Sequence, residues 1–290
     1  MSGCTLCPRM CGVDRTVQTG YCGSGSLAKV ARAAKHHWEE PCISGTQGSG
    51  TVFFSGCTLG CVFCQNREIS RGGTGREVTP EHLADIFRRL ESQGVHNLNL
   101  VTPVHFTQQI LQAFQLYRPS VPVVMNTGGY ERVETLRQWE NTVQIYLPDL
   151  KYHSPELSAK YSAAPNYFEA ASKAILEMHR QQPKLVWEGD LLKQGLIIRH
   201  LVLPGCVKDS MKVLDFLHEN LPKDSFLLSL MSQYTPTPAC AALPEINRRI
   251  TTYEYRKVAD RAAEMGFSGF AQDRRSAKEE YTPPFDLEGV

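Results

Sequence analysis

The chain lacks several features that would assign it to a membrane, a nucleic acid or a secretory route. No apolar run approaches the roughly 18–20 residues that a membrane-spanning helix needs. The formal net charge is only +1 over 290 residues, and there is no dense basic run, so general nucleic-acid binding is not expected. Residues 1–9 lack a charged segment followed by an apolar one, the pattern of a secretory leader. We therefore expect a soluble, cytoplasmic protein.

Cysteine, in contrast, is plentiful, with ten residues in all, which in a cytosolic chain indicates metal ligation more than disulfides. Cys57, Cys61 and Cys64 form a C-x3-C-x2-C motif, and no fourth cysteine follows nearby. Thiolates select iron–sulfur clusters, so these three predict ligands for three corners of a 4Fe-4S cube. The iron without a protein ligand can then bind a substrate. Three unrelated buried cysteines, or part of a zinc knuckle, are disfavoured because this glycine-flanked run follows a β-like stretch.

A second cysteine set precedes the first. Cys4, Cys7, Cys11 and Cys22 are spaced C-x2-C-x3-C-x10-C, and four thiols match the closed ligand count of a structural metal site. We expect a small metal module here, with zinc and a second iron–sulfur cluster equally open. The alternative is a set of free thiols or a labile redox pair. The remaining Cys42, Cys206 and Cys240 are most simply buried small hydrophobes.

Beyond residue 50, β-like stretches alternate with helix-like ones, the pattern of parallel strands with covering helices. We expect six such units, an α/β fold that fits an incomplete (β/α)6 barrel, with a flat doubly wound sheet as the runner-up. Thr79-Pro80-Glu81 predicts a helix start. The expected strands are Thr51–Ser55, Asn97–Thr102, Val121–Asn126, Thr142–Leu147, Leu196–Leu203 and Ser225–Ser232, and the expected helices are Thr79–Gln93, Phe106–Tyr117, Glu131–Glu140, Tyr167–Arg180, Met211–Glu219 and Thr252–Met265.

The domain organisation expected from this pattern has three parts. Residues 1–50 form a cysteine-rich extension, residues 51–265 the partial barrel, and residues 266–290 a tail that packs on it. The tail stretch Tyr281–Asp286 holds two prolines, so we expect it to lie extended across a surface. In either architecture, reactive loops gather at the carboxyl ends of the strands. Candidate residues fall there: Cys57, Thr102, Thr127, Asp149, Pro204 and Gln233.

The cysteine motif, with Phe63 just before its last cysteine, resembles the signature of the radical S-adenosylmethionine superfamily. In that family the open iron holds the amino and carboxylate groups of S-adenosylmethionine. One electron then cleaves the sulfonium to give a 5′-deoxyadenosyl radical. Further segments are similar to a branch labelled homologues of the pyruvate formate-lyase-activating enzyme; they are residues 4–9, 37–41, 43–45, 48–57, 99–103, 199–205, 231–236 and 281–286.

The resemblance covers nearly the whole chain and implies roles for particular residues. The cluster ligands would be Cys57, Cys61 and Cys64, and the Phe63 backbone would approach the adenine. Many relatives carry Gly-Gly-Glu at the second strand end, where this chain has Val101-Thr102-Pro103, so strand-end carbonyls are left to meet the methionine amino group. The other residues that would line the cofactor are Asn126, Thr127, Asp149, Lys151, Arg199, Gln233 and Tyr234.

Structural interpretations stand beside these roles. In the activating enzymes that the chain resembles, the equivalent strand ends can hold a monovalent cation, and oxygen donors of Thr127 and Asp149 suit a hard cation. Asp149 and Lys151 can also form a plain strand-end ion pair. Arg199 can simply stabilise the barrel end. Glu39 and its neighbour Glu40 either brace the cluster loop, which we favour, or bind a cationic substrate group.

Three functions follow for the chain. The favoured one is an enzyme that abstracts hydrogen from a small molecule, as in the queuine lyases of this branch, with Trp38, Glu39, Asp149 and Tyr130 available for a nucleobase. The second is an activating enzyme that installs a glycyl radical on a partner protein. The third is an electron-transfer protein without catalysis, which the missing fourth ligand disfavours. Either enzyme would need a reductant such as flavodoxin or ferredoxin.

Overall fold

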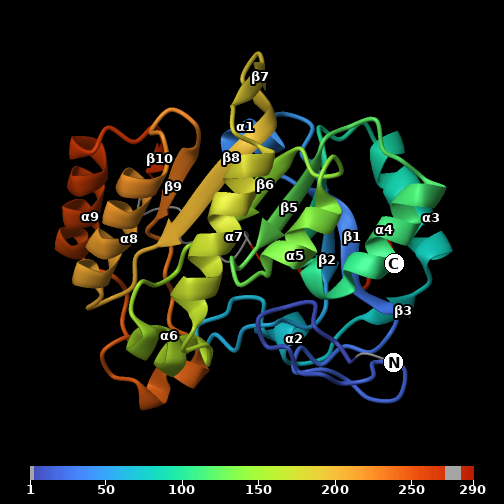
Figure 1. Cartoon of the computed structure of the whole chain (residues 1–290), viewed down its shortest axis with the longest axis horizontal. Coiled ribbons are helices and arrows are strands. Elements are labelled where there is room, and N and C mark those ends of the chain that lie inside the picture. Colours follow the sequence, from blue (N-terminus) through green and yellow to red (C-terminus); the bar gives the residue numbers. More distant parts are fainter. Residues whose placement is uncertain (1–2, 272–281) are drawn as a thin grey trace.

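A computed structural model describes residues 3–271 and 282–290 of the chain. Its core is one curved sheet, in which the order of the hydrogen-bonded strands is β10-β9-β8-β6-β5-β4-β2-β1-β3 (Figure 1). From β2 to β10 the neighbouring strands of this order are parallel. These strands are β2 (Ser49–Phe54), β4 (Leu98–Val101), β5 (Val123–Thr127), β6 (Ile145–Pro148), β8 (Leu191–Leu201), β9 (Leu227–Met231) and β10 (Gly269–Ala271).

Three further strands run antiparallel to their neighbours. β1 (Ala28–His36) pairs with β2, β3 (Arg76–Val78) pairs with β1, and β7 (Val186–Glu188) pairs with β8. The sheet therefore starts inside the stretch that the sequence pattern assigned to the amino-terminal extension. It also continues past residue 265, because β10 joins β9. The six expected strands are all present, and the fold is the α/β incomplete barrel expected.

The helices follow the strands as the sequence pattern predicts. Thr79 caps α3 (Pro80–Ser92), and its hydroxyl accepts a hydrogen bond from the His82 backbone N–H at 3.3 Å. Thr251 caps α9 (Thr252–Glu264) in a reciprocal capping box with Glu254. The other helices are α1 (Pro41–Ser44), α2 (Arg67–Ser70), α4 (Thr107–Leu116), α5 (Val133–Leu136), α6 (Pro155–Ser162), α7 (Tyr167–Gln181) and α8 (Val207–Asn220), with 3-10 turns at Val104–Phe106, Arg137–Trp139 and Pro238–Ala242.

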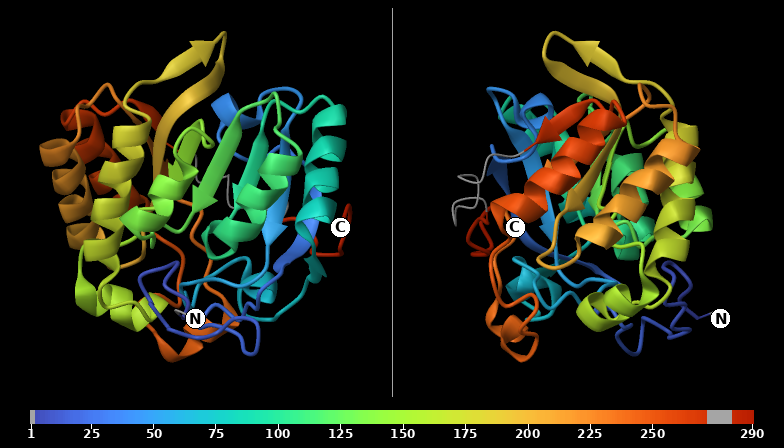
Figure 2. Two further views of the ribbon diagram at one scale, coloured as in Figure 1. Left: turned by 45° about the vertical axis from the view of Figure 1, so that its right-hand side comes forward. Right: turned by 90° about the vertical axis from the view of Figure 1, so that its left-hand side faces the viewer.

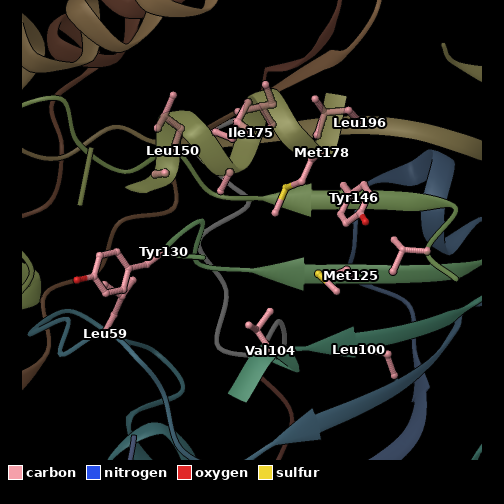
Figure 3. Packing of buried hydrophobic residues seen from close by; sticks show 14 of the residues in the cluster. Leu59, Leu100, Val104, Met125, Tyr130, Tyr146, Leu150, Ile175, Met178 and Leu196 are labelled. Atoms are coloured by element: carbon pink, nitrogen blue, oxygen red, sulfur yellow. The ribbon is translucent and has the colours of Figure 1, made fainter. Parts of the chain in front are cut away.

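The outer face of the sheet is apolar and packs on helices. Leu100, Met125 and Tyr146 are aligned across β4, β5 and β6, and each is fully buried. Figure 3 shows this row beside Ile175 and Met178 of α7. Because side chains alternate along a strand, the next residues on each strand face the inside of the curved sheet.

The inner face has two layers. At the amino end of the strands, Val124, Ile145 and Ile197 pack with Ile43 of α1 in a separate apolar cluster. The short helix α1 therefore plugs this end of the barrel. One step toward the carboxyl end, polar inward residues appear on β5 and β8, namely Asn126 and Arg199. This change of polarity along the strands places the site at the carboxyl end.

The two ends of the chain lie against the sheet. The amino-terminal segment, dark blue in Figure 2, lies beneath the carboxyl ends of the strands, at the opposite end from β7. The tail runs along β1: the Ala33 N–H donates to the Glu288 carbonyl at 2.8 Å, and Arg32 pairs with Asp286 at 2.6 Å. Residues 282–290 contain no helix, whereas Tyr281 lies outside the described residues. Within the described residues, no helix is long and apolar enough to cross a membrane.

We expect Met125→Ala to lower the free energy of unfolding by about 2–5 kcal/mol, because it leaves a cavity in the central apolar row. Urea unfolding at constant pH measures the change. The matched control is Leu116→Ala, whose side chain is 55% exposed and which should cost less than about 0.5 kcal/mol. Equal effects of the two substitutions would contradict this account of the core.

Candidate active site at the carboxyl ends of the strands

The loop that carries Cys57, Cys61 and Cys64 begins where β2 ends. Gly56 allows this turn, since its φ is +86° and a Cβ atom there would lie 2.5 Å from the Cys22 carbonyl oxygen. The Cys57 N–H donates to that same carbonyl at 3.3 Å. A side chain at position 56 would therefore separate the cluster loop from the amino-terminal segment.

Hydrogen-bond donors reach all three thiols of this loop. The Leu59 N–H lies 3.4 Å from Cys57 Sγ, the Ser162 hydroxyl 2.9 Å from Cys61 Sγ, and the Ser70 hydroxyl 3.5 Å from Cys64 Sγ. Burial raises the pKa of the free Cys57 thiol to about 12. Burial also raises the pKa of Cys61, where the Lys151 ammonium opposes it. Such thiols ionise when a metal replaces the proton.

A cavity of about 1080 Å3 connects this loop with the interior of the barrel. The three thiols line it together with the carboxyl ends of the strands and the segment before α1. The lining includes most of the residues that the sequence nominated, namely Phe63, Thr102, Asn126, Thr127, Asp149, Lys151, Arg199, Gln233, Tyr234, Trp38 and Glu39. One cavity thus brings together residues of β1, β2, β4, β5, β8, β9 and β10 with the cluster loop and the segment before α1.

Arg199 is the centre of a charged network inside the cavity. Its Nε donates to Asp149 Oδ1 at 2.8 Å, and its Nη2 donates to Asn126 Oδ1 at 2.5 Å. Its Nη1 lies 3.4 Å from Glu39 Oε2. The other Glu39 oxygen accepts from Asn99 Nδ2 at 2.9 Å and from Asn126 Nδ2 at 3.2 Å. Glu39 therefore binds residues inside the barrel. We had expected it to brace the cluster loop, and these contacts correct that expectation.

The carboxylates of this network differ in their protonation. Burial acts against ionisation of Asp149, but Arg199 and Lys151 outweigh it and lower its pKa. Burial raises the pKa of both Glu39 and Glu40, which the charge of Arg199 only partly offsets. For Lys151, burial is outweighed by the Asp149 carboxylate, so the pKa is raised. Asp149, Lys151 and Arg199 are accordingly charged. Glu39 and Glu40 hold a proton more readily than Asp149 does.

The other nominated residues take defined places at the rim. Phe63 and Tyr234 bring their rings within 5.7 Å of each other, and the Tyr234 hydroxyl donates to the Ile246 carbonyl at 2.8 Å. Gln233 contacts Met231 Sδ at 3.7 Å. Thr102 has a φ of +58°, and its N–H donates to the Asn126 carbonyl at 2.8 Å. This φ is rare outside glycine, and it turns the chain directly after β4.

Two expectations find no support in this geometry. Tyr130 is only 1% exposed and donates to Asn166 Oδ1 at 2.6 Å, away from the cavity lining, so it offers no stacking surface there. The monovalent-cation site also lacks free donors. The Asp149 carboxylate already pairs with Arg199 and Lys151, and the Thr127 hydroxyl donates to Glu131.

Sequence reasoning missed Glu131, which is buried behind the strand end of β5. One of its carboxylate oxygens accepts from Thr127, and the other has no hydrogen-bond partner. Burial raises its pKa to about 8. The only signal was an acidic residue four positions after the end of a strand, and no local pattern separates it from a solvated carboxylate.

The four cysteines of the amino-terminal segment are neighbours. A Cβ atom at Gly20 would lie 3.4 Å from Cys11 Sγ and 3.5 Å from Cys22 Sγ. Burial, and to a smaller extent the charges of Cys22 and Cys4, raise the pKa of the Cys7 thiol. Within residues 3–271 and 282–290, however, no three cysteine, histidine, aspartate or glutamate side chains form a group that could hold a single metal ion. A metal in this segment therefore remains a prediction.

Comparison with known proteins identifies the cluster loop. Residues 51–187, which include Cys57, Cys61 and Cys64, match the model of the radical SAM superfamily. Residues 51–187 are therefore a radical SAM domain. Its three-thiol loop, with donors to the sulfurs and an adjoining cavity, fits the 4Fe-4S cluster and S-adenosylmethionine that this family implies.

Individual proteins of known sequence or structure are similar to this chain. An uncharacterized protein of Methanocaldococcus jannaschii is 29% identical over 271 residues, which cover 89% of this chain and 74% of the relative. A radical SAM methyltransferase from Sphaerobacter thermophilus has a TM-score of 0.50 at 16% identity, over 77% of this chain and 65% of that one. A domain of pyruvate-formate lyase-activating enzyme from Bacteroides vulgatus has a TM-score of 0.40 at 17% identity, over 66% and 89%.

We expect Glu131→Gln to change the pH dependence of stability. The unfolded carboxyl ionises near its ordinary value of 4.5, whereas the folded one stays protonated up to about pH 8. The wild type therefore loses stability as the pH rises through this window, and the amide variant does not. The difference in free energy of unfolding should shift in favour of Glu131→Gln by a few kcal/mol between pH 5 and pH 8, at about 1.4 kcal/mol for each unit of pKa.

Urea unfolding at several pH values measures this difference. Glu134→Gln is the control, because Glu134 lies on α5 with an exposed side chain. Parallel stability curves for the wild type and Glu131→Gln would show that Glu131 is already ionised in the folded protein.

Proposed function

We propose that this protein cleaves S-adenosylmethionine reductively and directs the resulting 5′-deoxyadenosyl radical to a hydrogen atom of a small molecule. The observation that carries the proposal is the shared cavity: the three cluster-loop thiols and the buried Glu39, Glu40 and Arg199 all line it. Pockets for drug-sized ligands have volumes of roughly 300–1,000 Å3, so about 1080 Å3 leaves room for the cofactor and a second small molecule.

In this proposal the chain's own residues bind and orient the cofactor. Lys151 and Arg199 supply positive charge at the strand ends, where the carboxylate of S-adenosylmethionine needs it. The strand-end carbonyls near Thr102 accept from its amino group. Phe63 and Tyr234 offer an apolar surface for its adenine. Bound cofactor and substrate fill the cavity and exclude water from the radical, which reacts with almost any neighbouring group.

Glu40 favours a substrate with an N–H-bearing or cationic group. One oxygen of its carboxylate is buried and has no hydrogen-bond partner, and the residue lines the cavity. An unsatisfied buried polar atom costs about 1–3 kcal/mol, which a donor on the ligand would recover. The guanine-like edge of a queuosine-type nucleoside is such a donor, and Trp38 lines the same cavity as an aromatic surface.

We expect anaerobically reconstituted protein with dithionite to form 5′-deoxyadenosine, and Cys61→Ala to form none, because the cluster loses a ligand. Chromatography of the quenched reaction measures the product. Cys206→Ala is the control, since Cys206 is a buried cysteine outside the cavity lining, and it should retain the product. Formation of 5′-deoxyadenosine by Cys61→Ala would end the proposal.

We also expect queuosine to raise the rate of 5′-deoxyadenosine formation at least tenfold and to release queuine. Glu40→Gln should lower this stimulation at least tenfold, because a neutral amide no longer accepts from two N–H groups. Glu188→Gln, an exposed carboxylate paired with Lys193, should leave it intact. Absence of stimulation, together with a glycyl-radical signal on an added partner enzyme in electron paramagnetic resonance, would favour the activating function instead.

A further inference from the structure

The amino-terminal cysteines are built into a folded loop. The Cys4 N–H donates to the Val13 carbonyl at 2.9 Å, and the Gly12 N–H returns to the Cys4 carbonyl at 3.0 Å. Met10 and Gly12 take positive φ values of 42° and 67°, which turn the chain back on itself. These bonds fold the segment back on itself, and the Cys11 and Cys22 thiols both lie beside Gly20, at 3.4 and 3.5 Å from where its Cβ atom would be.

The spacing of these thiols disfavours zinc. A structural zinc ion draws four ligands to bonds of about 2.0–2.3 Å around one point, and the described residues contain no such group. Cys57, Cys61 and Cys64 do not form such a group either, and proteins of the radical SAM superfamily hold a four-iron cluster with these cysteines. Neighbouring thiols that do not converge on one point suit a cluster of several irons, which is wider than a single ion.

Hydrogen bonds to backbone carbonyls join the amino-terminal cysteine segment to the cluster loop. The Cys22 carbonyl accepts from the Cys57 N–H at 3.3 Å, and Arg9 Nε donates to the Thr58 carbonyl at 2.9 Å. Arg71 spans the same junction, since it donates to the carbonyls of Tyr21 at 3.1 Å and Leu59 at 2.7 Å. The guanidinium groups of Arg9 and Arg71 both lie over the Tyr21 ring, at 4.0 and 4.6 Å from its centre. Two cations therefore stand between the sets and can offset thiolate charge on both sides.

We propose that Cys4, Cys7, Cys11 and Cys22 hold a second iron–sulfur cluster that passes electrons to the cluster of Cys57, Cys61 and Cys64. Four thiolates leave no iron open, so this cluster carries electrons and binds no substrate. A one-electron donor of the flavodoxin or ferredoxin class reduces it, and it returns to its oxidised state as the same electron moves on. The relay rests on the proposed function, but the presence of the second cluster does not.

Iron analysis of a variant that lacks the first cluster tests the site. Cys57→Ala/Cys61→Ala/Cys64→Ala, reconstituted anaerobically, should retain two to four irons per chain with matching sulfide, the content of a 2Fe-2S or 4Fe-4S cluster, and a paramagnetic resonance signal after reduction. Adding Cys4→Ser and Cys7→Ser should remove both. The control is the triple variant with Cys42→Ser and Cys206→Ser in place of Cys4→Ser and Cys7→Ser. It should keep both the iron and the resonance signal. Zinc without iron, or no metal in the triple variant, would overturn the proposal.

The relay has its own measurement. In Cys4→Ser/Cys7→Ser, the ratio of the rate of 5′-deoxyadenosine formation with reduced flavodoxin to the rate with dithionite should fall at least tenfold relative to the wild type. A small reductant reaches the first cluster without the relay, whereas a protein donor does not. An unchanged ratio would reject the relay. If the wild type forms no 5′-deoxyadenosine with either reductant, the proposed function fails, while the iron count still decides the second cluster.

Discussion

The ion network around Arg199 is the interaction on which the site depends. Its guanidinium joins Asp149 at the carboxyl end of the sheet to Glu39 before α1 at the amino end, with Asn126 between them. Burying these charges is costly, and the mutual attraction repays the cost only while every partner is present. Loss of one partner from a buried pair typically costs about 3–5 kcal/mol. The network thus fixes the positions of α1, the strand ends and the cavity between them relative to one another.

The Arg199 network separates two layers of the barrel interior, an apolar one at the amino end and the thiols at the carboxyl end. Below it, Val124, Ile145 and Ile197 close the barrel with Ile43, which removes water from that end. Above it lie the thiols of the cluster loop. A radical formed beside the cluster would therefore meet walls held by ion pairs and hydrogen bonds, which leave little freedom for a misplaced reaction. Glu40 and Asn99 each keep an unpaired oxygen within this frame, and Glu40 lines the cavity, so a ligand there can complete its hydrogen bonding.

Local patterns in the sequence predicted what local forces determine. The apolar strands, the Thr79 cap and the cysteine spacing depend on neighbours within a few residues, and the structure has the strands and the cap. β1 was missed because its pairing with β2 depends on contacts between segments about 20 residues apart. The position of Glu39 was misjudged for the same reason: its partners Asn99, Asn126 and Arg199 are 60–160 residues away. Long-range contacts of buried charges leave no periodic trace in the sequence.

The charges around the cluster loop show why this loop sits where it does. A cluster with three thiolate ligands concentrates negative charge in a buried place, which requires nearby cations. Lys151 acts on Cys61 from one side, and Arg71 acts on Cys57 from the other. Lys151 is in turn held by Asp149, so the Arg199 network and the cluster loop share one electrostatic system. A change of charge on the cluster should thus be felt at Asp149 and Arg199, which line the cofactor cavity. Lys151 thus couples the charge of the cluster loop to the network around Arg199.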